Sequence, residues 1–312
     1  MDRSTFNQFR RIAYDRCGIA LSEGKEALLC ARLGKRMRAL GIRDPRAYLR
    51  HLTSDRSGQE AVHFVDAIST NVTHFFREPE HFRFARDAFA KWLNEGQQRF
   101  RFWSAACSSG EEPYSLAMTL LEAMNGQTVD LKILATDIST RVLAQCRDGV
   151  YEKGKLKDVP APLRERYFQP LGKGPEAAFR VDGAVKDLLV IKRLNLATPP
   201  FAMRGPLDII FCRNVMIYFD TEARKRLLDE MHRLLKPGGC LMVGHAESLA
   251  GMMSDFKAIK PSIYVKQEGE RSLAEPTARR RWPPCHRVVR GEAESATANS
   301  QGVLQSPGAF PG

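Results

Sequence analysis

Apolar positions near the amino-terminal end of the chain recur every three to four residues. Two such stripes precede residue 70: Phe6, Phe9 and Ile12, and then Leu29, Leu33, Met37 and Leu40. This spacing places side chains on one face of a helix, and strand signals are scarce in the same region. The pattern predicts a small all-helical domain over residues 1–76.

Farther along, short apolar runs alternate with amphipathic segments. Strands are predicted near 100–106, 131–137, 207–213 and 240–245, and helices near 111–124, 139–147 and 221–235. Strands that alternate with helices are typical of a doubly wound parallel sheet. The fold class predicted for residues 77–267 is therefore α/β, with the last helix ended by Lys236-Pro237-Gly238-Gly239.

Two segments depart from this alternation. Between about 149 and 194, short mixed runs are separated by turn residues at 172–175, which predicts an inserted small β-subdomain. Over residues 268–312 the apolar periodicity disappears and Glu, Ser, Ala, Pro, Gly and Arg dominate. We expect that tail to be disordered.

Polar residues gather where the predicted strands end. The loop after residue 103 is built of small residues and delivers Glu111 and Glu112 to the first turn of a helix. Asp137 ends the next strand, where an acid typically binds a ribose diol, and Arg213 and Asn214 end a third. Because the loop lacks the G-x-G-x-x-G pattern, a dinucleotide site is not predicted. These residues favour a nucleoside ligand in one crevice.

Four motifs carry a specific resemblance. They are the segments 71–78, 108–115, 211–219 and 244–248, which read NVTHFFRE, SSGEEPYS, FCRNVMIYF and GHAES. In this order and spacing the chain resembles the chemotaxis receptor methyltransferase family (CheR type) over roughly residues 1–267. The resemblance implies a class I methyltransferase-like sheet and an S-adenosylmethionine-dependent enzyme. It also implies methylation of glutamate side chains on the cytoplasmic helices of bacterial chemoreceptors.

The resemblance also implies a set of cofactor-binding residues. These are Asn71, Thr73, Arg77, Glu112, Asp137, Asn195, Leu196, Arg213 and Asn214. Alternatives stay open for several of them: Asn71 and Thr73 could cap a helix, Asn195 could end a strand, and Arg213 could form a structural ion pair. No metal ligands are predicted, since the seven cysteines include no C-x-x-C pair.

The chemistry of ester formation needs no general base. A glutamate carboxylate, with a pKa near 4.3, is ionised at neutral pH and can attack a sulfonium methyl directly. The enzyme must align the reacting atoms and exclude water. We expect Arg77 to orient the incoming carboxylate and Tyr218 to assist by hydrogen bonding near the transferred methyl.

The net charge of +12 points to an acidic partner. Residues 1–76 hold thirteen Lys and Arg against eight Asp and Glu, and the cations Arg32, Lys35, Arg36 and Arg38 surround the second apolar stripe. Such a helix face steers acidic proteins or phosphate backbones. The resemblance favours the acidic helices of a chemoreceptor as this partner. We expect the enzyme to be a monomer.

Other features set limits on localisation and function. No apolar run approaches the roughly 20 residues of a membrane span, and no secretory signal follows Met1, so a cytoplasmic protein without membrane insertion is expected. A nucleic acid methyltransferase is the alternative within the same enzyme class, although no Asn-Pro-Pro-Tyr or Asp-Pro-Pro-Tyr motif is present. A non-catalytic module that binds S-adenosylmethionine is the alternative outside it.

Overall fold

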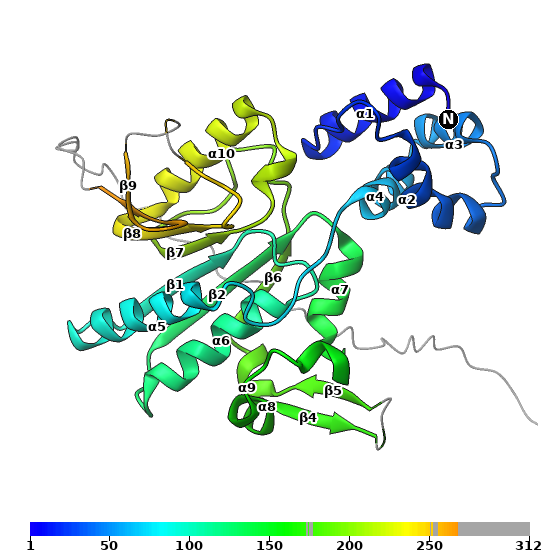
Figure 1. The fold of residues 1–312 in the computed structure, drawn as a ribbon. Helices are drawn as coiled ribbons and strands as arrows, with labels where there is room; N and C mark the ends of the chain where they lie inside the picture. Colours follow the sequence, from blue (N-terminus) through cyan, green and yellow to red (C-terminus); the bar gives the residue numbers. More distant parts are fainter. Residues whose placement is uncertain (173, 175–176, 250, 252–254, 268–312) are drawn as a thin grey trace, which may run out of the picture. The chain divides into compact units, whose positions relative to one another are not determined.

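The computed structural model describes residues 1–172, 174, 177–249, 251 and 255–267. The predicted disordered tail, 268–312, lies outside these residues. Figure 1 shows a group of helices formed by the amino-terminal part of the chain, a large sheet flanked by helices, and a small second sheet.

The amino-terminal part is all-helical, as predicted. Its helices are α1 (Arg3–Cys17), α2 (Glu26–Ala39), α3 (Pro45–Ser54) and α4 (Gln59–Ile68). Both predicted stripes face a common core, in which Phe6, Phe9, Leu29 and Leu33 are buried. Two of these helices, α1 and α3, begin at side-chain caps: Asp2 accepts a hydrogen bond from the backbone of Thr5, and Asp44 accepts from the backbone of Ala47.

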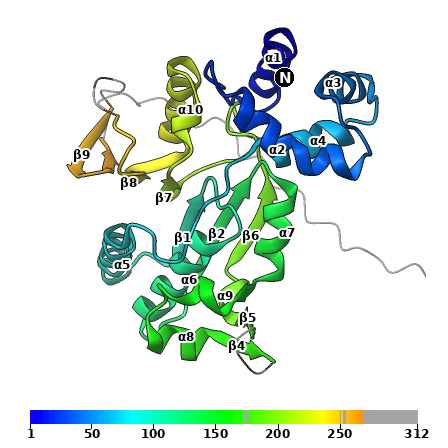
Figure 2. The ribbon, with the colours of Figure 1, turned by 45° about the vertical axis from the view of Figure 1, so that its right-hand side comes forward.

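The large sheet has seven strands in the order β6-β2-β1-β7-β8-β10-β9, and Figure 2 labels all of them except β10. The strands are β1 (Arg99–Ser104), β2 (Asp130–Asp137), β6 (Leu189–Arg193), β7 (Leu207–Cys212), β8 (Leu235–Val243), β9 (Phe256–Lys260) and β10 (Ile263–Lys266). All neighbours pair in parallel except β10, which is antiparallel to both β8 and β9. This arrangement confirms the predicted doubly wound α/β fold.

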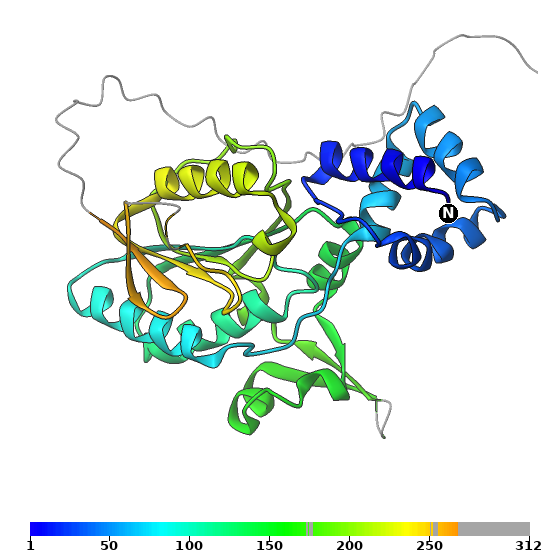
Figure 3. The same cartoon turned by 45° about the horizontal axis from the view of Figure 1, so that its top comes forward.

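Helices cover both faces of this sheet. They are α5 (Pro79–Asn94), α6 (Glu111–Met124), α7 (Thr140–Asp148) and α10 (Thr221–Leu234). Figure 3 shows α5, in cyan, and α10, in yellow-green, on opposite sides. The alternating side chains of β1 divide accordingly: Phe102 faces the core that includes α5 and α6, and Trp103 faces the core that includes α10.

The inserted β-subdomain is confirmed as a small antiparallel sheet in the order β3-β5-β4. Its elements are β3 (Val150–Glu152), η1 (Lys153–Leu156), α8 (Ala161–Tyr167), β4 (Phe168–Leu171), β5 (Ala178–Val181) and α9 (Gly183–Lys186). The range predicted for it, 149–194, is too long at one end. The last strand in that range, β6, pairs in parallel with β2 at the edge of the large sheet.

Further differences from the sequence analysis are elements that were not predicted, among them β9 and β10, and a strand boundary. Helix α5 was not predicted, although its apolar residues Phe82, Phe89 and Leu93 are buried. The Lys236-Pro237-Gly238-Gly239 segment follows the end of α10 by one residue but lies inside β8. The register between β7 and β8 shifts there, so the strand absorbs the proline and glycines as an irregularity.

Candidate active site

A cavity of about 320 Å³ opens where β1, β2 and β7 end. Ala105, Asp137 and Arg213, which end or directly follow these strands, all line it. The strand order reverses between β1 and β7, and open α/β sheets bind ligands at such a switch point. The volume falls in the range of ligand sites, roughly 300 to 1,000 Å³.

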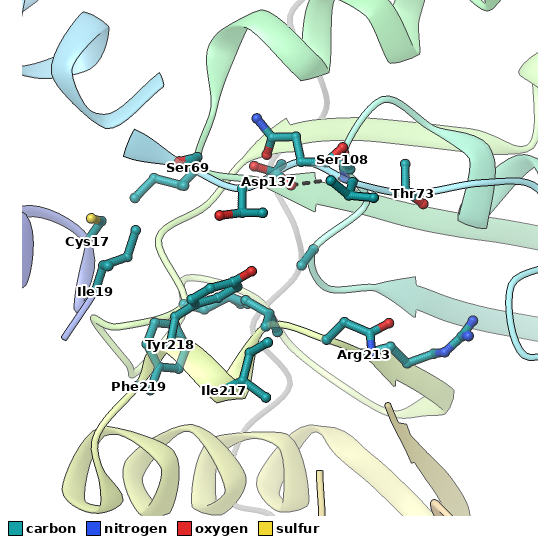
Figure 4. Close-up of a pocket in the computed structure, with 18 of the residues that line it drawn as sticks. Cys17, Ile19, Ser69, Thr73, Ser108, Asp137, Arg213, Ile217, Tyr218 and Phe219 are labelled. Carbon is teal, nitrogen blue, oxygen red and sulfur yellow. Dashed lines mark hydrogen bonds between the residues drawn. The ribbon is translucent and has the colours of Figure 1, made fainter. Parts of the chain in front are cut away.

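Glu111, which the sequence analysis placed beside Glu112 in the crevice, is fully buried and does not line this cavity, but every residue predicted to act in catalysis or cofactor binding does. These residues are Asn71, Thr73, Arg77, Glu112, Asp137, Asn195, Leu196, Arg213, Asn214 and Tyr218. They come from five segments that are far apart in the sequence, and Figure 4 shows several of them around the common space. The fold thus brings the whole set together.

Asp137 is buried at the end of β2 and held by backbone N–H groups. One carboxylate oxygen accepts a hydrogen bond from Ser108 N and the other from Ser139 N, both at 2.9 Å. Burial raises the pKa of Asp137, and these hydrogen bonds act in the opposite direction. The result is a carboxylate of fixed orientation whose remaining lone pairs suit hydroxyl donors.

Arg213 is paired inside the protein. Its side chain is 1% exposed and lies 3.0 Å from a carboxylate oxygen of Glu78 and 3.1 Å from one of Glu112, and it also donates to the carbonyl of Arg77. Figure 4 shows its guanidinium directed away from Tyr218. The ion pair that the sequence left open as an alternative is therefore formed.

The two carboxylates beside Arg213 respond differently to burial. Burial raises the pKa of Glu112 in spite of Arg213 and a hydrogen bond of 2.7 Å from Ser104 Oγ. For Glu78, burial alone would also raise the pKa, but Arg213 and His245 together outweigh burial and the pKa is lowered. Glu78 was not among the predicted site residues, although it lies in the first motif.

Glu247 shapes the loop that follows β7, and sequence reasoning missed it. Its buried carboxylate accepts hydrogen bonds from Asn214 N and Gly244 N at 2.7 Å and from Ile217 N at 3.3 Å. A Cβ on Gly244 would clash with the side-chain amide of Asn214, which explains the glycine. The only sequence feature that could have indicated Glu247 is its position three residues after Gly244 in the motif GHAES.

Tyr218 and Arg77 both present side chains to the cavity. Figure 4 shows the Tyr218 hydroxyl projecting into the open space, while its backbone carbonyl accepts a hydrogen bond from Ala20 N at 2.9 Å. The half-buried Arg77 donates to the carbonyl of Val72 at 3.2 Å and forms no ion pair with any described residue. Arg77 thus offers positive charge for an external carboxylate.

Two asparagines in the wall differ in how their side chains are used. Asn195 donates to Arg16 O at 3.0 Å and accepts from Ala197 N at 3.1 Å, so its amide ties together parts of the protein. The buried Nδ2 of Asn71, in contrast, has no hydrogen-bond partner among the described residues. A buried donor of this kind is costly unless a ligand accepts from it.

A stretch near the amino terminus also lines the cavity, and no sequence pattern indicated it. This stretch runs from the last residue of α1 into α2, and its lining residues are Cys17, Ile19, Ala20, Leu21, Ser22, Lys25 and Leu28. Sequence spacing says nothing about contacts over such a separation, so only the tertiary structure could place this stretch at the cavity.

The four cations of the predicted basic helix face are not equivalent. Arg36 pairs with the buried carboxylate of Glu60, and Arg32 donates to the carbonyl of Ile68 and, at 2.5 Å, to Thr70 Oγ1. Lys35 and Arg38 are exposed and pair with no described residue. Arg32 and Arg36 therefore have structural roles, and only the other two offer free charge on α2.

Two family models together match nearly all of the described chain. The model for the all-alpha domain of CheR methyltransferases matches residues 4–69, and the model for their SAM binding domain matches residues 71–265. The chain belongs to the CheR methyltransferase family. The resemblance carried by the four motifs is thereby confirmed.

Curated relatives agree with this CheR methyltransferase assignment. The chain is 41% identical over 263 residues to chemotaxis protein methyltransferase 2 of Pseudomonas aeruginosa, covering 84% of this chain and 92% of that protein. It is 37% identical over 261 residues to the chemotaxis protein methyltransferase of Escherichia coli, covering 83% and 90%.

As a CheR methyltransferase, the protein is an enzyme whose cofactor is S-adenosylmethionine. The cavity fits that cofactor, since Asp137 offers a buried acceptor for hydroxyls and Asn71 a buried donor that no described residue satisfies. When bound, the cofactor supplies an electrophilic methyl group. No helix in the described part of the chain combines the length and apolar character of a membrane span.

Proposed function

We propose that this enzyme acts in chemotaxis and methylates glutamate side chains on the cytoplasmic helices of chemoreceptors. The names of the curated relatives support a chemotaxis substrate. The observation that carries the acceptor chemistry is Arg77, a cation in the cavity wall with no carboxylate partner among the described residues. A glutamate side chain entering the cavity would supply that partner.

The reaction proposed is a direct displacement. A glutamate oxygen forms a bond to the methyl carbon as the carbon–sulfur bond breaks, and the products are a glutamyl methyl ester and S-adenosylhomocysteine. Arg77 holds the carboxylate, and the Tyr218 hydroxyl orients it beside the methyl group. No side chain accepts a proton, because the carboxylate is already ionised at neutral pH.

The remaining wall residues are proposed to bind the cofactor. Asp137 accepts from its ribose hydroxyls, and Asn71 donates from its Nδ2, which has no hydrogen-bond partner in the described part of the chain. Thr73 and Asn214 contact its polar groups, and Leu196 packs against its adenine. Arg213 and Glu112 act through their ion pair, which fixes the backbone of Arg77.

Receptor docking is proposed to use the exposed cations of α2. Lys35 and Arg38 face solvent, so they can steer an acidic helix toward the cavity. Their contribution is expected mainly in the association rate, which should fall as salt screens the charges.

The test is transfer of labelled methyl from S-adenosylmethionine to receptor-bearing membranes, with tRNA and DNA as parallel acceptors. Mild alkali should release the label from receptor as methanol, which identifies an ester. A receptor whose acceptor glutamates are replaced by alanine is the control. Label found on nucleic acid, or on no acceptor, would contradict the proposal.

A further inference from the structure

Exposed apolar side chains gather at the cavity. In the described part of the chain, six large hydrophobic side chains are exposed, and three of them line the cavity. These are Val72 at 78% exposure, Ile217 at 47% and Leu28 at 43%. Scattered single apolar residues on a surface need no explanation, but a cluster at one opening marks an interaction site.

The three side chains come from three separate parts of the fold. Leu28 lies in α2, Val72 in the segment between α4 and α5, and Ile217 in the short helix η2 (Met216–Tyr218). Two of them adjoin residues that face the reaction, since Ile217 precedes Tyr218 and Val72 accepts the hydrogen bond from Arg77. The cluster therefore borders the place where an acceptor must enter.

Charge around the same opening is positive. Lys25 and Arg77 line the cavity, and neither of them pairs with a carboxylate in the described residues. The cavity lining contains two acidic residues. Glu112 forms an ion pair with Arg213, and Asp137 accepts hydrogen bonds from backbone N–H groups. A border with exposed apolar side chains and unpaired cations complements a partner surface that carries both apolar side chains and carboxylates.

We propose that Leu28, Val72 and Ile217 form a docking rim for the acceptor helix. The rim contacts apolar side chains three or four residues from the target glutamate, which lie on the same helix face. The glutamate then points between the rim residues toward Arg77. This inference rests on the proposed function and adds that acceptor choice depends on apolar neighbours of the glutamate.

The test replaces each rim residue by serine and measures methyl transfer to receptor membranes. We expect Val72→Ser, Leu28→Ser and Ile217→Ser each to raise the acceptor KM about tenfold, because each removes apolar surface that docking buries. The dissociation constant for S-adenosylmethionine, measured by calorimetry, should stay within twofold. Val72→Ile, which restores an apolar side chain, should recover most of the acceptor affinity.

Matched controls come from exposed apolar residues elsewhere. Val190 in β6 and Ile259 in β9 are 39% and 42% exposed and do not line the cavity. Val190→Ser and Ile259→Ser should leave the acceptor KM unchanged. A thermal melt of each variant checks that the fold is retained.

The outcomes separate the rim from the proposed function. Unchanged acceptor KM in all three rim variants, with an active wild-type enzyme, overturns the rim alone. A matching loss of cofactor affinity also overturns it, because the side chains would then belong to the cofactor wall. A wild-type enzyme that leaves receptors unmethylated overturns the proposed function and the rim with it.

Discussion

Single buried charges in the cavity wall are stabilised in two different ways. Arg213 is surrounded by two carboxylates, so its charge is balanced inside the protein. Among the described residues Asp137 has no cationic partner, and backbone N–H groups hold its carboxylate. A buried carboxylate without a counter-charge is costly unless it is hydrogen bonded, so Asp137 is the side chain best prepared to accept hydroxyls of a ligand.

Asp137→Asn should therefore weaken binding of S-adenosylmethionine about 10- to 100-fold, because hydrogen bonds to a charged acceptor are the strong ones. Isothermal titration calorimetry measures the effect. Asp130→Asn, at the exposed start of the same strand, is the control and should bind normally. Unchanged affinity in Asp137→Asn would remove Asp137 from the ribose site.

Arg77→Ala should lower kcat by about 100-fold and change the cofactor dissociation constant less than threefold. The reason is that Arg77 is proposed to orient the acceptor carboxylate, which matters for the transition state rather than for cofactor binding. Single-turnover kinetics and calorimetry provide the two numbers. Arg83→Ala, exposed on α5, is the control. Equal losses in rate and affinity would make Arg77 a cofactor ligand instead.

His81 makes stability depend on pH. Burial, with a contribution from Arg213, lowers the pKa of His81 to about 4 from its ordinary 6.5. Between these pH values the His81 side chain binds a proton in the unfolded chain but not in the folded protein. The free energy of unfolding therefore falls as pH falls from 6.5 toward 4. From pH 7.5 to pH 5 the loss from this group is about 2 kcal/mol.

Urea denaturation at pH 7.5 and pH 5 tests the effect. His81→Phe should lose about 2 kcal/mol less than wild type between the two pH values, whatever its stability at pH 7.5. His63→Gln, on the exposed face of α4, should keep the wild-type difference. If His81→Phe and wild type lose the same free energy of unfolding between pH 7.5 and pH 5, the pH dependence comes from other groups.

Among the elements, the inserted subdomain contacts the loop of residues 108–111 directly. Tyr151 of β3 donates its hydroxyl to Ser109 O at 2.6 Å, and Lys155 lies 3.5 Å from the buried carboxylate of Glu111. The Tyr151 ring also packs edge-on against Phe75, with ring centroids 5.0 Å apart. The insertion thus supports both the 108–111 loop and the first motif.

Tyr151→Phe should weaken cofactor binding about fivefold. The substitution keeps the ring packing and removes only the hydrogen bond that fixes the loop, which contributes about 1 kcal/mol. Tyr167→Phe is a matched control in the same subdomain, since that hydroxyl bonds Glu122 on α6, away from the loop. Equal affinities in the two variants would show that the loop is held without Tyr151.

At the scale of the whole molecule, the amino-terminal helices complete the cavity. Ala20 N donates to Tyr218 O, Tyr14 donates its hydroxyl to Asp220 at 2.6 Å, and Thr140 donates to Asp66 at 2.9 Å. Gly18, at the end of α1, has a positive φ of 70°. A Cβ there would lie 2.5 Å from the Ala197 Cβ and 3.3 Å from the Phe219 ring.

Gly18→Ala should weaken cofactor binding, since the new methyl group clashes with Ala197 and pushes the end of α1 away from it and from Phe219 in the cavity wall. We expect at least a tenfold loss in calorimetry. Gly24→Ala is the control: its φ of 78° imposes comparable backbone strain, but no atom lies within 4 Å of the added Cβ. Similar losses of cofactor affinity in the two variants would show that backbone strain, rather than displacement of the end of α1, causes the loss.

The sequence by itself determined the helical and α/β parts, because hydrophobic periodicity reports local structure directly. It also placed Asp137, Arg213 and Asn214 at strand ends, since carboxyl ends of parallel strands converge. It could not show that Arg213 forms ion pairs with Glu78 and Glu112, or that Arg36 forms one with Glu60. Those outcomes depend on which side chains meet across the fold.

Only the tertiary structure decided how the cavity is closed and bordered. Glu247 acts on a loop about thirty residues earlier in the chain, and the stretch after α1 reaches a wall nearly two hundred residues away. Periodicity carries no information on such distant pairings, because they are fixed by packing of whole elements. The sequence therefore specified the kind of site, and the packing decided which residues border it.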